Sequence, residues 1–347
     1  MARELTVSID AMGGDAGPGV VVTAIARSVL RHPLAKFILH GDEAKLKPLF
    51  AKRSKLLDRV SIRHAPDRVS MEERPSIALR RGRNTSMWRA IESVKTKEAE
   101  VVLSAGNTGA LMAMGMFQLG VLDGIARPAL AVILPTRRGQ VIVLDVGANV
   151  QSDAEQLVDF AVMGEAFARA ILNLERPSVG LLNVGSEDVK GNDAVKRAAH
   201  ILRNVSLPME FSGFVEGDDI AEGSADVIVT DGFTGNIALK TAEGTARLIS
   251  GYLRGALRRS FLARMGAVLA SGALSALRRK LDPRAFGGGV FLGLNGVVVK
   301  AHGSTDALGF ASALDMAIDV AEAGTINRII ADHATVVSAL STGAAAS

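Results

Sequence analysis

The sequence repeats one pattern that strongly limits its fold. An apolar, β-branched run ends in a loop containing Gly with Asn, Asp or His, and a helical pattern follows. The six runs are Thr6–Asp10, Glu100–Ser104, Val141–Leu144, Val179–Leu182, Asp226–Val229 and Gly296–Lys300. Such units predict a parallel α/β sheet with helices on both faces. Because ligands bind at the carboxyl ends of the strands in these sheets, we expect the six loops to form one shared site.

The longest uncharged run, Val101–Leu122, has 22 residues, which is long enough to cross a membrane. It contains Ser104, Asn107, Thr108, Gln118 and four glycines. We therefore expect a buried strand, a turn and a helix in place of a membrane span.

The chain has 347 residues. At roughly 150 residues per domain, this length suits two domains or one large domain with two lobes. We expect residues 1–347 to form a single catalytic α/β domain with two lobes, and 341–347 to form a frayed tail. The sequence begins without the pattern of an export signal, which predicts a cytoplasmic protein.

Composition excludes several classes of function. The absence of Cys removes disulfides, iron–sulfur ligation and a thiolate nucleophile. With 12 Phe, one Trp and one Tyr, the chain has few base-stacking side chains, so we expect no nucleic-acid partner.

Common catalytic motifs are missing as well. The sequence has no G-x-S-x-G elbow, no Gly-Lys pair for a phosphate-binding P-loop, and no G-x-G-x-x-G after a strand. The six His residues are scattered. Asp315 and Asp319 lie one helical turn apart and could hold Mg²⁺, but a solvated helix face is the simpler interpretation. We therefore expect no metal and no cofactor.

Three loops carry cations or strong hydrogen-bond donors beside Gly. They are Lys190-Gly-Asn192, the loop from Asp231 to Asn236 with Lys240 one turn beyond it, and His302-Gly-Ser304. Lys side chains and helix N-termini bind phosphate, and Asn amides stabilise an oxyanion. Together these groups suit a small oxyanion beside a carbonyl. An exposed Lys, a helix cap and a core His remain alternative interpretations.

At these motifs the sequence resembles the bacterial phosphate acyltransferase (PlsX) family of phospholipid synthesis. The matching stretches lie in order along the chain and begin at Asp10, Ser104, Leu144, Leu181, Lys190, Gly213, Asp231, Gly287 and His302. The resemblance implies an isocitrate/isopropylmalate-dehydrogenase-like, three-layer α/β/α fold related to phosphotransacetylase, with two lobes and a cleft.

The same resemblance implies a reaction and partners. A long-chain acyl group would pass from acyl carrier protein (ACP) to orthophosphate, giving acyl phosphate for a downstream glycerol-3-phosphate acyltransferase. It also implies a homodimer that associates peripherally with the inner face of the membrane.

From the chemistry of the loops we assign Lys190, Asn236 and His302 to catalysis. Phosphate would bind near Lys190, Asn192, Asn236 and Lys240. The full set of expected phosphate- or substrate-binding residues is Asp15, Ser104, Asn107, Thr108, Asn183, Asn192, Asp231, Lys240 and Ser304.

Much of the net charge of +4 gathers in segment 254–285. Here the 13 uncharged residues Met265–Leu277 lie between basic clusters, and as a helix they would reach only about 20 Å. We expect Ser271-Gly272 to divide them into two short helices, making a hairpin that contacts an anionic membrane or acidic ACP. The residues assigned to this contact are Arg258, Arg259, Leu269, Leu274, Arg278, Arg279 and Lys280. A hairpin packed on a dimer mate is the alternative.

Three other functions remain open. They are a phosphotransacetylase-like transferase that uses small acyl-CoA, a membrane scaffold for lipid-synthesis enzymes, and a metal- and NAD-dependent dehydrogenase on the same fold. The apolar segment argues against the first, the six polar loops against the second as a sole role, and the lack of a metal cluster in the sequence against the third.

Overall fold

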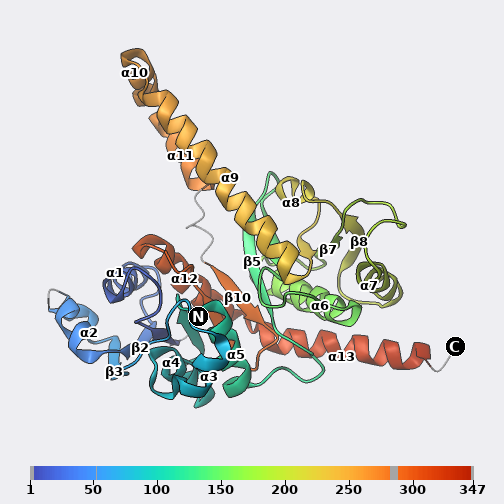
Figure 1. Cartoon of the computed structure of the whole chain (residues 1–347), viewed down its shortest axis with the longest axis horizontal. Helices are drawn as coiled ribbons and strands as arrows, with labels where there is room; N and C mark the ends of the chain where they lie inside the picture. The colour runs from blue at the N-terminus through green and yellow to red at the C-terminus, as the bar shows by residue number, and fades with distance from the viewer. Residues whose placement is uncertain (1–3, 52, 282–287, 345–347) are drawn as a thin grey trace.

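The computed structural model describes residues 4–51, 53–281 and 288–344 (Figure 1), with side chains described to residue 277 and again from 288 to 336. The strands are β1 Thr6–Asp10, β2 Lys36–Gly41, β3 Val60–His64, β4 Val101–Ser104, β5 Ala129–Pro135, β6 Gln140–Leu144, β7 Ser178–Leu182, β8 Glu210–Val215, β9 Val227–Val229, β10 Gly289–Leu292 and β11 Val297–Lys300.

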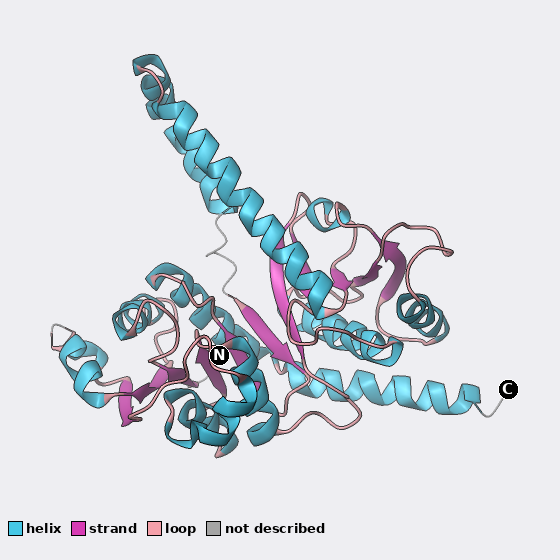
Figure 2. Cartoon of the chain, in the orientation of Figure 1, coloured by secondary structure: helices cyan, strands magenta, loops and turns pink. Residues whose placement is uncertain are grey.

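The helices alternate with most of these strands (Figure 2). They are α1 Pro18–Ser28, α2 Glu43–Phe50, α3 Pro75–Arg81, α4 Ser86–Lys95, α5 Thr108–Leu119, α6 Ala154–Ile171, α7 Asp193–Asn204, α8 Asp219–Glu222, α9 Gly232–Arg258, α10 Phe261–Leu269, α11 Ser271–Leu281, α12 Ala307–Ala323 and α13 Thr325–Ala344. Two short 3₁₀ turns lie at Ser54–Leu56 and Gly82–Asn84.

All six expected strand–loop–helix units are present. The run Val101–Leu122 forms β4, a turn and α5, which confirms the expected buried strand and helix. Polar side chains fix where several helices begin: Asn107 accepts a hydrogen bond from the Ala110 N–H, and Asp153 forms a capping box with Gln156. Among the described residues, no helix is both long enough and apolar enough to cross a bilayer.

The described strands form one sheet with the order β3-β2-β1-β4-β11-β10-β5-β6-β9-β7-β8. At one end of the sheet the neighbouring strands β3, β2, β1, β4 and β11 pair in parallel. At the other end β6, β9, β7 and β8 also pair in parallel. Between these blocks, β10 pairs antiparallel with both β11 and β5, and β5 pairs antiparallel with β6. The sheet is therefore mixed, although mainly parallel.

The three antiparallel pairings correct one expectation. Because strand direction reverses three times between β11 and β6, the two parallel blocks run in opposite directions. The six polar loops therefore do not share one edge of the sheet. Three loops follow β1, β4 and β11, and three follow β6, β7 and β9. We call the part of the molecule built on β3, β2, β1, β4 and β11 the first half, and the part built on β6, β9, β7 and β8 the second half. Each half therefore carries its own set of polar loops.

Helices cover both faces of the sheet, which confirms the three-layer α/β/α class. On one face, α12 packs over β4 and β11 and against α1, and α6 packs over β6 and β9. On the other face, α4 packs over β1, β2 and β4, and the first turns of α9 reach β6. Alternation along β1 shows the division: Val7 and Ile9 join the first core, while the hydroxyl of Ser8 donates to the Ala90 carbonyl on α4.

Helices α9, α10 and α11 form an arm that projects from the body (Figure 1). The break between Leu269 and Ser271 confirms the expected division into two short helices. The lead-in differs, because Arg254 and Arg258 belong to the 27-residue helix α9 and not to a separate hairpin. At the other end of the chain, α13 includes residues 341–344 of the expected tail, and 345–347 lie outside the described residues.

Leu39 on β2 and Leu30 after α1 form a matched pair for testing the core. Leu39 is fully buried, whereas Leu30 is 84% exposed. We expect Leu39→Ala to lower the free energy of unfolding by about 2–5 kcal/mol, because it removes buried methyl groups and leaves a cavity. Leu30→Ala should change it by less than about 0.5 kcal/mol. Urea denaturation checks both, and equal losses would contradict the packing described.

Candidate active site

A buried carboxylate organises the loops of the first half. Asp10, the last residue of β1, is 1% exposed and accepts hydrogen bonds from the hydroxyls of Ser86 (2.6 Å) and Ser104 (2.7 Å). The Met12 N–H also donates to it. A Cβ at Gly13 would lie 2.5 Å from the Asp10 Oδ2, so only glycine allows this close turn. Burial raises the pKa of Asp10, and its hydrogen bonds oppose that rise.

The sheet register places Asp10 in a row of polar side chains. Asp10 on β1 is the register partner of Ser104 on β4, and Ser104 is the partner of Lys300 on β11. Register partners on parallel strands point to the same face, and adjacent strands lie about 4.8 Å apart. A carboxylate, a hydroxyl and an ammonium group therefore follow one another across the carboxyl ends of three strands.

Lys300 is a functional candidate that was not predicted from the sequence. Its side chain is 7% exposed, and it donates to the carbonyls of Ala105 and Ala301. An ammonium group has three N–H donors, so one has no partner among the described residues. Burial lowers the pKa of Lys300 to about 8, although the nearby Asp10 and Asp15 raise it. The sequence signal that could have revealed it is a Lys at the end of an apolar strand, directly after the buried residues Val298 and Val299.

Asp145 plays the corresponding part in the second half. It follows β6, is fully buried, and accepts from the backbone N–H groups of Leu130, Gly147 and Ala148. Asn149 donates to it through both backbone and side chain. Burial raises the pKa of Asp145, and these hydrogen bonds oppose the rise. This aspartate was not among the site residues predicted from the sequence.

Helix α9 begins directly against the Asp145 loop. A Cβ at Gly235 would lie 1.9 Å from the Asp145 carbonyl oxygen, so a larger residue would push the helix away. Asp231 caps α9 by accepting from the Thr234 N–H and hydroxyl. Asn236, one turn into the helix, lies beside Gly147. The local sequence thus fixes both the position and the direction of α9.

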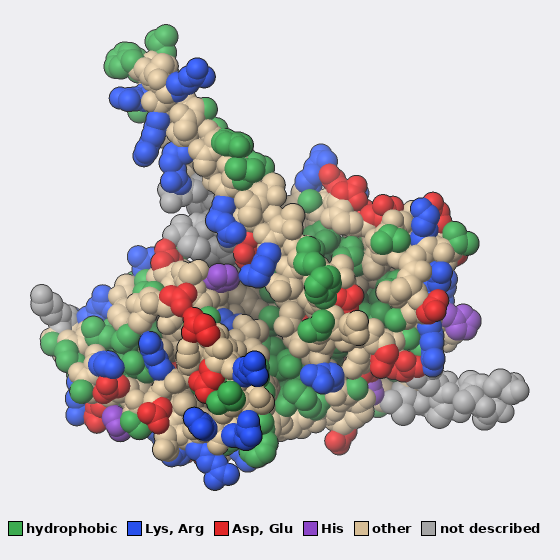
Figure 3. All heavy atoms as spheres, viewed as in Figure 1, with side chains coloured by type: hydrophobic (Ala, Val, Ile, Leu, Met, Phe, Trp, Pro, Cys, Tyr) green, Lys and Arg blue, Asp and Glu red, His purple; other side chains and the backbone are tan. Residues whose placement is uncertain are grey.

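Charged side chains from the two halves meet where α9 passes the β11 loop. Lys240 on α9 is close enough to lower the pKa of Lys300 and of His302, and Glu243 is close enough to raise that of His302. Figure 3 shows a hollow between the halves at the base of the arm, with basic and His side chains at its rim. The two sets of loops therefore approach one another across a cleft, despite the opposed strand directions.

His302 lies at this junction with its ring partly held. The Ser304 N–H donates to its Nδ1 (3.3 Å), and the Ser304 hydroxyl lies 3.0 Å from the same atom. Burial lowers the pKa of the imidazole, and the neighbouring cations lower it further. Near pH 7 the ring is therefore mainly neutral, with Nδ1 as acceptor and Nε2–H as donor. This state suits polarising a carbonyl better than donating a full proton.

Several predicted binding side chains instead hold the backbone. Asn107 caps α5 through Oδ1, while its Nδ2 donates to the carbonyls of Met71 (2.8 Å) and Glu73 (2.9 Å). Ser104 is enclosed between Asp10 and the Gly106 N–H, and Asp231 is a cap. The helix-cap alternative thus describes Asn107 and Asp231, because their oxygens are committed to N–H groups of the chain.

The loop after β7 keeps Lys190, Asn183 and Asn192 together. Asn183 donates to the carbonyls of Gly185 and Lys190, and Asn192 caps α7 through the Val195 N–H. The Lys190 ammonium is 3.7 Å from Glu187, and its side chain is 48% exposed. Since β7 is next to β9 in the sheet, this loop lies beside the start of α9.

Asp15 and Thr108 lie in the regions that follow β1 and β4. The Asp15 N–H donates to the Gly303 carbonyl (2.9 Å), which ties the β1 loop to the loop that carries His302. Thr108 is the first residue of α5, where unpaired backbone N–H groups favour an anion.

The described residues contain no group of three or more His, Asp or Glu side chains arranged to hold a metal ion. Asp315, considered above as a possible ligand, accepts from Ser28 (3.0 Å) and pairs with Arg31 and His32. Its oxygens are therefore engaged in packing α12 against α1.

The fold is that of phosphotransacetylases. The chain superimposes on EutD phosphotransacetylase from Staphylococcus aureus with a TM-score of 0.60 at 17% identity, covering 93% of this chain and 95% of that one. It also matches 4-hydroxythreonine-4-phosphate dehydrogenase from Klebsiella pneumoniae with a TM-score of 0.53 at 13% identity, covering 92% and 100%. At these identities the likeness concerns the fold alone. It confirms the expected dehydrogenase-like fold that is related to phosphotransacetylase.

Sequence relatives identify the family. A family model described as fatty acid synthesis protein matches residues 5–328. The phosphate acyltransferase of Parvibaculum lavamentivorans is 56% identical over 333 residues, covering 96% of this chain and 92% of the relative. That of Sinorhizobium fredii is 55% identical over 330 residues, covering 94% and 95%. The chain belongs to this fatty acid synthesis protein family. Its relatives are named phosphate acyltransferases, which confirms the resemblance that the motifs indicated.

Because Lys300 is buried, we expect the free energy of unfolding to depend on pH. Because its folded-state pKa is about 8, below the ordinary 10.5, the unfolded chain binds more protons between these values, and stability rises with pH there. Relative to Lys300→Met, the native protein should gain about 2 kcal/mol in free energy of unfolding from pH 8 to pH 10. Urea denaturation at each pH measures this gain. Identical pH profiles for the two proteins would show that Lys300 is not buried as an ammonium.

Proposed function

We propose that this chain transfers a long-chain acyl group from acyl-ACP to orthophosphate, forming acyl phosphate and free ACP. The membership of the family and its relatives' name, phosphate acyltransferase, support the reaction. The observation that carries the proposal is the cleft, where Lys240, Lys300 and His302 from the two halves come within electrostatic range of one another. Such a site attracts an anion and can hold a carbonyl beside it.

Phosphate supplies the nucleophile in this proposal. Lys240 and Lys190 bind its oxygens from the second half, while Lys300 adds positive charge from the first. Asn236 and Asn192, at or near the starts of α9 and α7, provide further donors. Since phosphate is already an anion at pH 7, its attack needs no strong general base, and the described residues need supply no acyl-enzyme nucleophile.

The carbonyl is activated from the β11 loop. Phosphate oxygen forms a bond to the thioester carbon, and the carbon–sulfur bond breaks to release a thiolate on the carrier. His302, neutral near pH 7, donates its Nε2–H to the carbonyl oxygen as negative charge develops there. The thiol that corresponds to this leaving group has a pKa near 8.5, so the thiolate leaves with little help from an acid.

Purified protein tests this reaction directly. With palmitoyl-ACP and phosphate it should form acyl phosphate, detected as hydroxamate, and acetyl-CoA should react at least about tenfold more slowly. Loss of a charge-assisted hydrogen bond costs about 1.5–3 kcal/mol. Lys190→Ala and Lys240→Ala should therefore each lower kcat/KM for phosphate at least tenfold.

Lys47→Ala is the matched control, because Lys47 is exposed on α2 and pairs with Glu43. Its kcat/KM should equal that of the native chain. Thioester loss that does not depend on phosphate would contradict the proposed reaction. A preference for acetyl-CoA would favour the small-acyl alternative.

We also propose that the arm attaches the enzyme to the inner face of an anionic membrane. Its tip exposes Phe261, Leu262, Val268 and Leu269, each more than 70% exposed. Figure 3 shows basic side chains next to this apolar tip. Three arginines, Arg254, Arg258 and Arg264, line a hollow of about 510 Å³ between α9 and α10, which suits an anionic headgroup.

Among the residues assigned to this contact, Arg258 and Leu269 fit the proposal by position. Arg259 caps the end of α9, and Leu274 is half-buried on α11. The side chains of Arg278, Arg279 and Lys280 lie outside those described. ACP, which is acidic, remains a second proposed partner for the same basic surface.

A homodimer is a further proposal. Along α9, the apolar side chains of Leu248, Ile249 and Tyr252 are more than half exposed in the single chain. A contiguous apolar face of this kind usually contacts another surface. A second copy packed along α9 would leave the tip free. At the membrane, the reactive acyl phosphate would then be released close to the proposed downstream glycerol-3-phosphate acyltransferase.

The tip makes a prediction that separates membrane contact from general surface effects. Leu269→Asp should weaken binding to vesicles of anionic phospholipid by at least about tenfold, since burial of a Leu side chain contributes about 1.5–3 kcal/mol. Leu30→Asp changes an equally exposed residue, 84% against 87%, on the body of the protein. Its vesicle co-sedimentation should match that of the native chain. If both variants sediment alike, the tip does not insert.

A further inference from the structure

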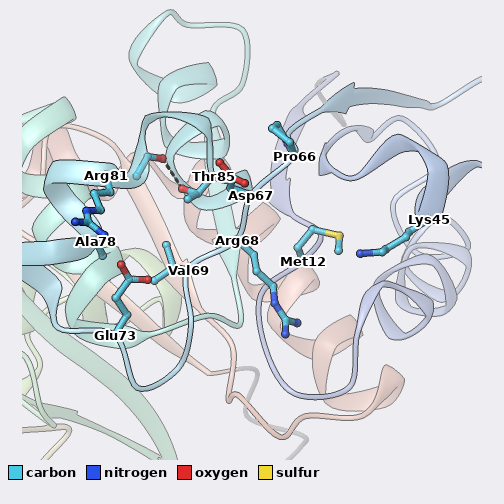
Figure 4. Close-up of a pocket in the computed structure, with 11 residues that line it drawn as sticks. Met12, Lys45, Pro66, Asp67, Arg68, Val69, Glu73, Ala78, Arg81 and Thr85 are labelled. Carbon is cyan, nitrogen blue, oxygen red and sulfur yellow. Dashed lines mark hydrogen bonds between the residues drawn. The ribbon is translucent and has the colours of Figure 1, made fainter.

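A separate cavity lies in the first half of the molecule, between the β1 loop, α2 and the segment that follows β3. Its volume is about 450 Å³, much larger than a single phosphate ion. Met12 from the β1 loop and Lys45 from α2 form one side, and Arg81 and Glu73 lie on the opposite side (Figure 4). Arg68 extends between them, from the segment that follows β3. None of these lining residues was assigned above to phosphate or to the thioester.

The charges of this cavity favour an anionic ligand that also carries N–H groups. Lys45, Arg68 and Arg81 contribute three cations, against the carboxylates of Asp67 and Glu73. Among the described residues, neither Arg68 nor Arg81 forms a side-chain hydrogen bond or an ion pair, and Lys45 lies 3.3 Å from Asp42. The two arginines are therefore available to an outside anion, while the carboxylates can accept from amides.

The cavity is joined to the cleft through its own wall. The Met12 N–H donates to Asp10 at 3.2 Å, so the inner side of the cavity is the loop that Asp10 fixes. The Asn107 amide holds the carbonyls of Met71 and Glu73. The Met71 side chain in turn packs against Gly303, the neighbour of His302. The cavity and the cleft therefore share the β1 loop and the Met71–Glu73 segment as walls.

We propose that this cavity binds the 4′-phosphopantetheine arm of the acyl carrier. The proposal rests on the proposed function, because it assumes a thioester substrate carried on that arm. Arg68 and Lys45 bind the phosphate group of the arm, and Asp67 and Glu73 accept from its amide N–H groups. The thioester end then passes Met12 toward His302. The assignment explains why Asn107, which the sequence predicted to bind phosphate, is committed to holding the cavity wall.

Binding of two small probes to the full chain tests the proposal. Titration calorimetry should show 4′-phosphopantetheine binding at least tenfold more tightly than pantetheine, which lacks the phosphate. Arg68→Ala should remove that preference, because a charge-assisted hydrogen bond is lost. Lys47→Ala, on α2 but not among the lining residues, should keep it. Equal affinity of the native chain for both probes, or a preference that survives in Arg68→Ala, would overturn the proposal.

Steady-state kinetics separate this proposal from the proposed function. Arg68→Ala should raise KM for acyl-ACP about tenfold and leave KM for phosphate unchanged. If KM for phosphate rises instead, the cavity binds orthophosphate and the proposal is wrong. Because calorimetry needs no turnover, tighter binding of 4′-phosphopantetheine without acyl phosphate formation would support the cavity and contradict the reaction. Acyl phosphate formation without any probe preference would do the reverse.

Discussion

The candidate site depends on a charge buried at a strand end in each half of the protein. Asp10 and Asp145 stand at the carboxyl ends of β1 and β6, and nearby hydroxyl or N–H groups satisfy both. Leaving a buried carboxylate without such donors would cost several kcal/mol. The loops that supply the donors are therefore fixed in shape. Glycines at the close contacts, such as Gly13 and Gly235, let the backbone approach the aspartate loops.

This arrangement explains how opposed strand blocks can serve one cleft. Each aspartate sets its own loop, and neither requires the two blocks to share a sheet edge. Helix α9 then joins them, because its start is held against the Asp145 loop while Lys240 reaches the neighbourhood of Lys300 and His302. A buried Lys300 lowers stability at neutral pH, and its position beside the cleft gives that cost a functional reason.

The sequence predicted the parts of the fold that repeat a local pattern. β1, β4, β6, β7, β9 and β11 each lead into a Gly loop and a helix, and all were expected. The other five strands, β2, β3, β5, β8 and β10, were not predicted. Of these, β5 and β10 each lead into another strand and not into a helix, so the repeated pattern could not reveal them or the reversal of direction that they cause. Helix α9 continues to Arg258, into the segment 254–285 from which the sequence predicted a separate hairpin.

The candidate site was predictable in its loops and less so in its atoms. The local sequence pattern around an Asn in the loop after a strand is the same whether the Asn caps a helix, as Asn192 does, or faces a ligand. Asp10 and Lys300 owe their roles to register across strands far apart in sequence, which local spacing does not record. The motifs indicated the family. The structure then separated the side chains that hold the backbone from those that are available to a ligand.

Direct attack by phosphate requires that phosphate occupy the cleft between the two halves. A crystal structure of the chain with saturating orthophosphate tests this most directly. The anion should lie between Lys240 on α9 and the loop that carries His302, with Lys300 beneath it. Phosphate found instead in the cavity at Arg68, with none in the cleft, would contradict the account.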